Sequence, residues 1–182
     1  SEPVAGQSSV AAMAVAALAV EQGIQSFPEL FQACGAEENI TGHDNFWRQF
    51  RKLVQLPAIN TRKGVDLRGA IESGEVIYIV GSCDNERVIK LQKMLLLRLM
   101  QIVKGQDRSK VTRPVCVVLD EFKHVISPVA LTALGVVRDF NSHFLLAHQS
   151  LGDLRQCPGI DPAAVEGAVL DNTALKIIFR IN

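Results

Sequence analysis

The sequence predicts an α/β fold, in which a mainly parallel sheet with flanking helices follows a smaller helical region. After residue 63, short apolar runs alternate with amphipathic stretches, which is the pattern of strands joined by right-handed crossover helices. Residues 115–119 form an apolar run of β-branched and large side chains, as expected for a strand that is buried on both faces. Residues 1–63 show helical spacing alone.

The composition is compatible with one domain and a smaller appended region. The chain has 182 residues, 48% of them hydrophobic, which is enough for a sizeable core. Lysine plus arginine equals aspartate plus glutamate at 19 each, so the chain as a whole lacks a strongly basic nucleic-acid-binding character. The four cysteines are widely spaced, which favours reduced thiols over a disulfide framework or a zinc site.

The helical region, residues 1–63, is expected to contain three helices. Ser8 or Ser9 would cap the first, which ends near Gly23, and Ser26 would cap a short second helix. The third covers about residues 44–56 and stops before a proline.

The third expected helix is amphipathic. Trp47 belongs to its apolar side and is expected in the core, whereas Arg48, Arg51 and Lys52 lie on the other side. That spacing is typical of a solvated face, and contact with DNA or a protein partner is the alternative.

The second region, residues 64–182, begins at a polar connector. Its expected strands cover residues 75–80, 115–119, 143–147 and 174–179. Its expected helices cover about residues 66–71, 85–104, 128–140, 151–155 and 162–170. Tyr78, in the first of these strands, is expected to be buried.

Two adjacent acids, Asp120 and Glu121, end the apolar run 115–119. Open α/β sheets bind their ligands at the carboxyl ends of the strands, and an apolar strand that ends in two acids has the form of a Walker B motif. In that chemistry the first acid holds the Mg²⁺ of a nucleotide and the second polarises the attacking water. The alternative is structural, because acids in the first turn of a helix suit its dipole.

The sequence lacks the glycine-rich phosphate-binding loop, G-x-x-x-x-G-K-[ST], that a P-loop ATPase needs. The chain is therefore not a complete nucleotidase of that class by itself. Either the loop precedes Ser1 in a larger parent protein, or the ATPase interpretation is wrong.

Further motifs continue the pattern. Val-Leu-Asp-Glu-Phe at 118–122 is followed by an expected helix ending in Arg138, and then by Leu-Ala-His-Gln-Ser at 146–150. Asp-Asn at 171–172 and Lys-Ile-Ile-Phe-Arg at 176–180 come later. In this order the segments resemble the C-terminal half of the motor domain of type IV secretion coupling proteins, the TraD/TraG class of conjugative DNA-transfer ATPases. The likeness covers roughly residues 74–180, and the helical region is similar to the family's all-α domain.

The resemblance implies a fragment of a RecA-like P-loop NTPase fold whose cofactors are ATP and Mg²⁺. The parent protein would be a hexamer anchored at the cytoplasmic face of the bacterial inner membrane. It would recruit a relaxase–DNA complex, with its relaxosome proteins, and drive DNA through the components of a secretion channel. The fragment itself would be soluble and inactive alone, with the missing Walker A loop upstream of Ser1.

Carried over residue by residue, the resemblance assigns four site residues. Asp120 would bind Mg²⁺ through water, Glu121 would act as catalytic base, and Gln149 would sense the γ-phosphate. Arg138 would reach the nucleotide of a neighbouring subunit, as an arginine finger does. Here Val137 and Asp139 flank Arg138 where the family commonly has Gly-Arg, and Asp139 would pair with Arg138 and weaken this role.

Each assignment has a structural alternative. Gln149 would then be a strand-end polar residue satisfied by the backbone, and Arg138 a solvated cation. At the level of the whole chain, the alternatives are a non-catalytic module that recruits proteins and a fragment of another RecA-like translocase.

Overall fold

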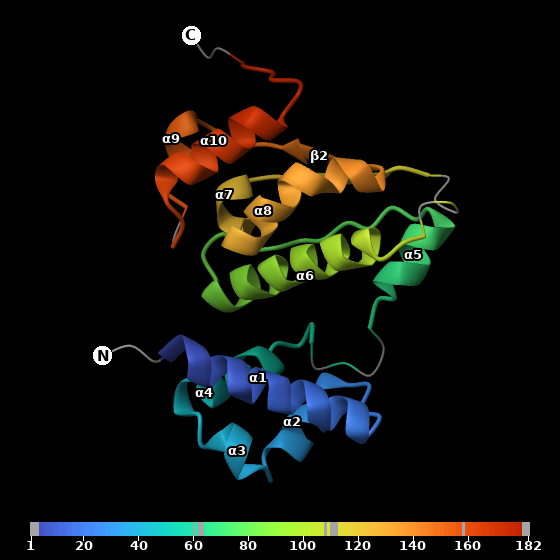
Figure 1. The fold of residues 1–182 in the computed structure, drawn as a ribbon, viewed down its shortest axis with the longest axis vertical. Helices are drawn as coiled ribbons and strands as arrows, with labels where there is room; N and C mark the ends of the chain where they lie inside the picture. Colours follow the sequence, from blue (N-terminus) through green and yellow to red (C-terminus); the bar gives the residue numbers. More distant parts are fainter. Residues whose placement is uncertain are drawn as a thin grey trace. The chain divides into compact units, whose positions relative to one another are not determined.

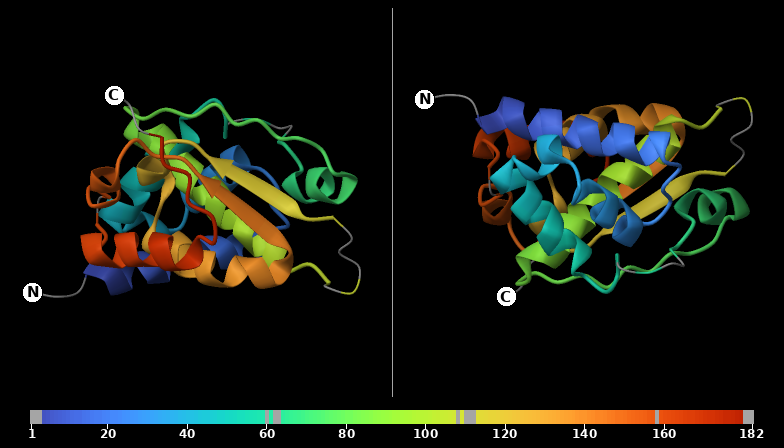
Figure 2. Two further views of the ribbon diagram at one scale, coloured as in Figure 1. Left: turned by 90° about the horizontal axis from the view of Figure 1, so that it is seen from above. Right: turned by 90° about the horizontal axis from the view of Figure 1, so that it is seen from below.

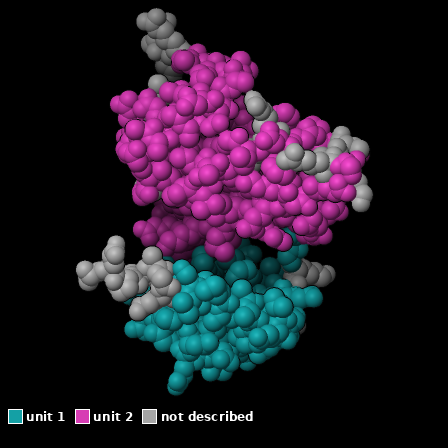
Figure 3. Space-filling model, viewed as in Figure 1, with its two compact units in different colours: residues 1–65 teal, residues 66–182 magenta. Residues whose placement is uncertain are grey.

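The computed structural model describes residues 4–59, 61, 64–107, 109, 113–157 and 159–179, and omits the side chains of 4–8, 137, 138 and 151. The chain divides into two compact units, residues 1–65 and 66–182 (Figure 3). The sequence predicted that the helical region ends at residue 63, whereas the boundary between the two compact units follows residue 65. Within the described ranges, no helix combines the length and the apolar character needed to cross a membrane.

Unit 1, residues 1–65, is helical throughout its regular structure (Figure 1). Its helices are α1 (Val4–Glu21), α2 (Phe27–Cys34), α3 (Glu38–Thr41) and α4 (Asp44–Val54). The Ser26 hydroxyl accepts a hydrogen bond from the backbone N–H of Glu29 at 3.4 Å, so the expected cap of α2 is confirmed. The short helix α3 has no counterpart in the sequence analysis, since four residues carry too little periodicity to predict.

The core of unit 1 is partly aromatic. The Phe31 and Trp47 rings stack with centroids 4.7 Å apart, and Phe50 meets Phe31 edge-on at 5.8 Å. Trp47 is half-buried and packs against this core, as its apolar side of α4 predicted. Arg48, Arg51 and Lys52 are exposed.

Unit 2, residues 66–182, combines helices with one pair of strands. Its elements are α5 (Leu67–Ser73), α6 (Glu86–Lys104), β1 (Val115–Leu119), α7 (Phe122–Val125), α8 (Pro128–Val137), a 3₁₀ turn (Arg138–Phe140), β2 (Ser142–Leu146), α9 (Leu151–Leu154) and α10 (Pro162–Asn172). Side chains cap the starts of several helices: Asn85 accepts from the N–H groups of Arg87 and Val88 at α6, and Asp161 from Ala164 at α10.

The strands β1 and β2 run parallel and pair in register from Val115 opposite Ser142 to Leu119 opposite Leu146 (Figure 2). Val117 and Leu119 of β1 and Leu146 of β2 pack against a core that the helices supply, which includes the fully buried Phe122. The other face is open, and Val118 is 62% exposed. The prediction that residues 115–119 are buried on both faces is therefore wrong, because helices of unit 2 cover only one face of this pair.

Two of the four expected strands, residues 75–80 and 174–179, are irregular instead, and the described sheet has two strands. Tyr78 is 89% exposed, so its expected burial is also wrong. Strand-forming side chains stabilise a strand only against a neighbouring strand, and neither segment has one among the described residues. Unit 2 thus has α/β character with a parallel pair, and a RecA-like sheet remains a prediction.

Candidate functional site

The carboxyl ends of β1 and β2 lie side by side, and backbone hydrogen bonds extend the pairing into the following loops. The Ala147 N–H donates to the Leu119 carbonyl at 2.9 Å, and the Phe122 N–H donates to the Ala147 carbonyl at 3.1 Å. These bonds bring Asp120 and Glu121, which follow β1, next to residues 147–150, which follow β2. Strand-end polar groups from two neighbouring strands therefore share one edge of the sheet.

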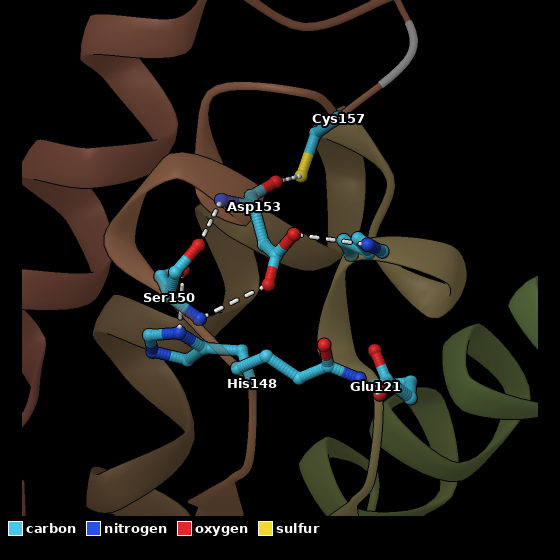
Figure 4. A network of polar contacts seen from close by, with 7 residues as sticks. Glu121, His148, Ser150, Asp153 and Cys157 are labelled. Carbon is cyan, nitrogen blue, oxygen red and sulfur yellow. Dashed lines mark hydrogen bonds and ion pairs between the residues drawn. The ribbon is translucent and has the colours of Figure 1, made fainter. Parts of the chain in front are cut away.

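Glu121 and Gln149 meet at this edge. The Gln149 Nε2 donates a hydrogen bond of 2.7 Å to the Glu121 Oε1 (Figure 4). The two residues are 28 positions apart in the sequence, and their contact depends on the parallel register of β1 with β2. The structure thus places three of the four residues that the sequence singled out at one edge, since Asp120 directly precedes Glu121.

The backbone of Glu121 is left-handed, with φ 49° and ψ 52°. A non-glycine residue in this region is uncommon, and such strain concentrates at functional sites. The Asp120 Oδ1 supports the turn by accepting a hydrogen bond of 3.0 Å from the Glu121 N–H. The turn reverses the chain between β1 and α7 and leaves the Glu121 carboxylate facing the loop after β2.

The possible metal ligands that Asp120 and Glu121 supply at this edge are carboxylate oxygens. The Asp120 side chain is exposed and that of Glu121 is half-buried. Among the described residues, no group of three or more histidine, cysteine or acidic side chains could hold a metal ion. One or two carboxylates suit Mg²⁺, which keeps several waters and binds the phosphates of a substrate. Asp120 and Glu121 are therefore the candidates for holding a hydrated Mg²⁺.

A second contact joins the short helices that follow the two strands, α7 and α9, and involves residues that the sequence analysis missed. The Lys123 Nζ lies 2.9 Å from the Asp153 Oδ1. Asp153 and Ser150 form a capping box at the start of α9, in which each side chain accepts a hydrogen bond from the other residue's N–H. The spacing Ser-x-x-Asp directly after Gln149 is a readable signal for this cap. Lys123 carries no such signal, because its partner lies 30 positions away.

The charges of Lys123 and Asp153 stabilise each other. The hydrogen bond from Lys123 holds the pKa of the Asp153 carboxyl below its usual value, and the same bond raises the pKa of Lys123. Next to them, burial raises the pKa of the Cys157 thiol, whose Sγ lies 3.9 Å from the Asp153 carbonyl. We therefore expect a charged Lys123–Asp153 pair and a protonated Cys157 at neutral pH.

The remaining predicted site residue is Arg138. Its backbone lies in the 3₁₀ turn between α8 and β2, and its side chain is outside the described residues. The predicted pairing of Arg138 with Asp139 falls outside them for the same reason.

Comparisons with known proteins give one partial match. No protein-family model matches the chain, and no solved structure matches it significantly. Over 106 residues, which are 58% of the chain, it is 39% identical to Mobilization protein A of Escherichia coli. The match covers 20% of that protein, so the chain spans about a fifth of the relative's length.

Proposed function

We propose that this chain is part of a nucleotide-driven motor in conjugative DNA transfer, to which it contributes the Walker B acids and the glutamine of the neighbouring strand. The observation that carries the proposal is the 2.7 Å hydrogen bond between Gln149 and Glu121 at the carboxyl ends of two adjacent parallel strands. The left-handed backbone of Glu121 supports it, since strain of this kind marks functional positions. The name of the E. coli relative, Mobilization protein A, supports a link to mobilization.

In this proposal each side chain at the edge has a chemical role. Bound MgATP would supply the phosphoryl group and a cation that neutralises its charge. Asp120 would hold a water of the Mg²⁺ shell, and Glu121 would accept a proton from the attacking water. The Gln149 amide, which donates to Glu121 here, is a neutral donor that suits a phosphate oxygen equally well.

The proposal extends to the parent protein. That protein would supply a phosphate-binding loop that this chain lacks, and it would work as a hexamer at the cytoplasmic face of the inner membrane. Its partners would be DNA, the relaxase with other relaxosome proteins, and components of the secretion channel. Arg138 would act on the nucleotide of the neighbouring subunit.

The decisive test is Glu121→Gln in the natural protein that contains this chain, assayed for ATP hydrolysis and for nucleotide binding. Loss of a general base is expected to lower kcat by roughly 10²–10⁴-fold while nucleotide still binds. Glu72→Gln, the same change at an exposed position of α5, is the matched control and should leave hydrolysis unchanged. A Glu121→Gln protein that hydrolyses ATP at the normal rate would refute the role of Glu121.

A second candidate, recruitment of a protein or relaxosome partner by unit 1, is favoured by the separate aromatic core of that unit. The exposed cations Arg48, Arg51 and Lys52 of α4 are its candidate contacts. Replacing all three with glutamate in the full chain should abolish capture of a relaxase–DNA complex without changing the circular dichroism spectrum. Replacing Arg68, Arg87 and Arg98 of unit 2 in the same way is the control.

A further inference from the structure

Two side-chain bridges join the segment after β1 to the segment after β2, and Glu121 of the first and Asp153 of the second are labelled in Figure 4. The first is the hydrogen bond from Gln149 to Glu121. The second, between Lys123 and Asp153, begins two residues after Glu121 and ends four residues after Gln149. The two bridges therefore connect the same pair of segments, and each one restricts the geometry that the other can adopt.

A continuous series of contacts leads from Lys123 to the residue next to Gln149. The two carboxylate oxygens of Asp153 have different partners, because Oδ1 faces Lys123 and Oδ2 accepts from the Ser150 N–H at 3.0 Å. The Ser150 hydroxyl accepts in turn from the Asp153 N–H at 3.2 Å. Since Ser150 follows Gln149 directly, the position of Asp153 fixes the backbone from which the Gln149 side chain extends.

The two bridges differ in exposure. Gln149 is exposed, and its long side chain has several rotatable bonds. Holding it in one contact therefore costs conformational entropy. The side chains of Lys123 and Asp153 are only 23% and 13% exposed. A partly buried ion pair is screened less by water and salt than an exposed one. The Lys123–Asp153 bridge is therefore the more persistent of the two.

We propose that Lys123 is a positioning residue, which through Asp153 and Ser150 holds the loop after β2 so that the Gln149 amide reaches the Glu121 carboxylate. The positioning itself needs no nucleotide. Its consequence for hydrolysis rests on the proposed function, because only there does the pair of Glu121 and Gln149 act on a nucleotide.

The chain offers a matched control in a second ion pair of unit 2. The Arg155 Nε lies 2.9 Å from the Glu166 Oε2, the same distance as in the Lys123–Asp153 pair, and it connects the end of α9 to α10. Arg155 is 64% exposed, and its pair involves neither Glu121 nor Gln149. Loss of this pair removes an ion pair from the same unit without touching the proposed series of contacts.

The test is an NMR measurement of the Gln149 side-chain amide in the ¹⁵N-labelled full chain without nucleotide. The signal is assigned by its loss in the Gln149→Glu variant. In the wild type, the hydrogen bond should shift one amide proton downfield and slow its exchange with water. Lys123→Met, which keeps the length and removes the charge, should return the signal to that of a solvated glutamine. Lys123→Arg should restore the shifted signal, and Arg155→Met should leave it unchanged.

A Gln149 signal that is the same in Lys123→Met and in the wild type would overturn the proposal. If Lys123→Met does not fold, Asp153→Asn replaces it, because asparagine keeps an oxygen for the Ser150 N–H while losing the charge that attracts Lys123. An unchanged Gln149 signal in folded Asp153→Asn would overturn the proposal equally.

This measurement separates the positioning from the proposed function, because the signal is read without ATP. A Glu121→Gln protein with normal hydrolysis would refute the proposed function, but it would not change what the Gln149 signal of Lys123→Met says about the positioning. If the proposed function and the positioning are both correct, Lys123→Met in the natural protein should lower kcat about tenfold. The KM for ATP should stay nearly unchanged, as expected when a contacting group is misplaced.

Discussion

Four segments of unit 2 have a strand-forming composition, but only two of them form strands. Residues 115–119 and 142–146 pair in parallel and place one face on the core, whereas residues 75–80 and 174–179 are irregular and leave large apolar side chains in solvent. Phe179, for example, is 85% exposed. Composition therefore makes a segment competent for a sheet, whereas a neighbouring strand and a covered face decide whether it becomes part of one.

The largest expected difference between these regions comes from removing one aromatic ring from each. Phe122, directly after the β1 loop, is fully buried, so Phe122→Ala should destabilise unit 2 by about 3–5 kcal/mol through lost packing and a cavity. Urea unfolding followed by far-UV circular dichroism measures the change.

Phe179→Ala is the matched control, because it removes the same atoms from an exposed position. It should shift stability by no more than about 0.5 kcal/mol. Equal losses in the two variants would mean that residues 174–179 are packed in solution, and the comparison would fail.

Amide hydrogen exchange distinguishes the paired strands from the irregular segments at single residues. The amides of Phe122 and Ala147 donate to backbone carbonyls that join the loops after the two strands, so their exchange should be slowed about a thousandfold or more. The amides of residues 76–79, which lie outside the sheet, should exchange within about tenfold of an unstructured chain. Protection of 76–79 equal to that of Ala147 would show a strand partner in solution.

The smallest expected effect is that of Tyr78→Ser. Its side chain is 89% exposed, so thermal unfolding should give a stability within about 0.5 kcal/mol of the wild type. Leu146→Ser, at a position of β2 that packs on the core, is the contrasting change and should be clearly destabilising. A loss of more than about 2 kcal/mol in Tyr78→Ser would be too large for an exposed site.

Local signals explain which parts of the fold were predictable. Helix α6 was expected to end near Lys104 because either Asp84 or Asn85 could cap it and its apolar residues have helical spacing. The helix covers Glu86–Lys104, and Asn85 is the cap. The strand at 75–80 was predicted with equal reason and is absent, because strand formation depends on residues far away in the sequence.

The same distinction holds for the site. The sequence placed Glu121 and Gln149 each at the carboxyl end of an expected strand, where open α/β sheets bind their ligands, and the structure shows the contact between them. The pair of Lys123 and Asp153 joins a four-residue helix to a cap 30 positions away, and no local pattern relates them. The sequence therefore predicted which groups stand at the strand ends, and not the ion pair that joins the segments after the two strands.

If Glu121 has the proposed role, its left-handed backbone sets thermal stability against that role at one position. Glycine adopts φ 49° without steric cost, whereas glutamate there is strained. Selection for stability alone would favour glycine, so a directed-evolution experiment that screens only for heat resistance should accept Glu121→Gly. The carboxylate that accepts the hydrogen bond from Gln149 would be lost in that step, so the protein would gain stability and lose the base of the proposed mechanism.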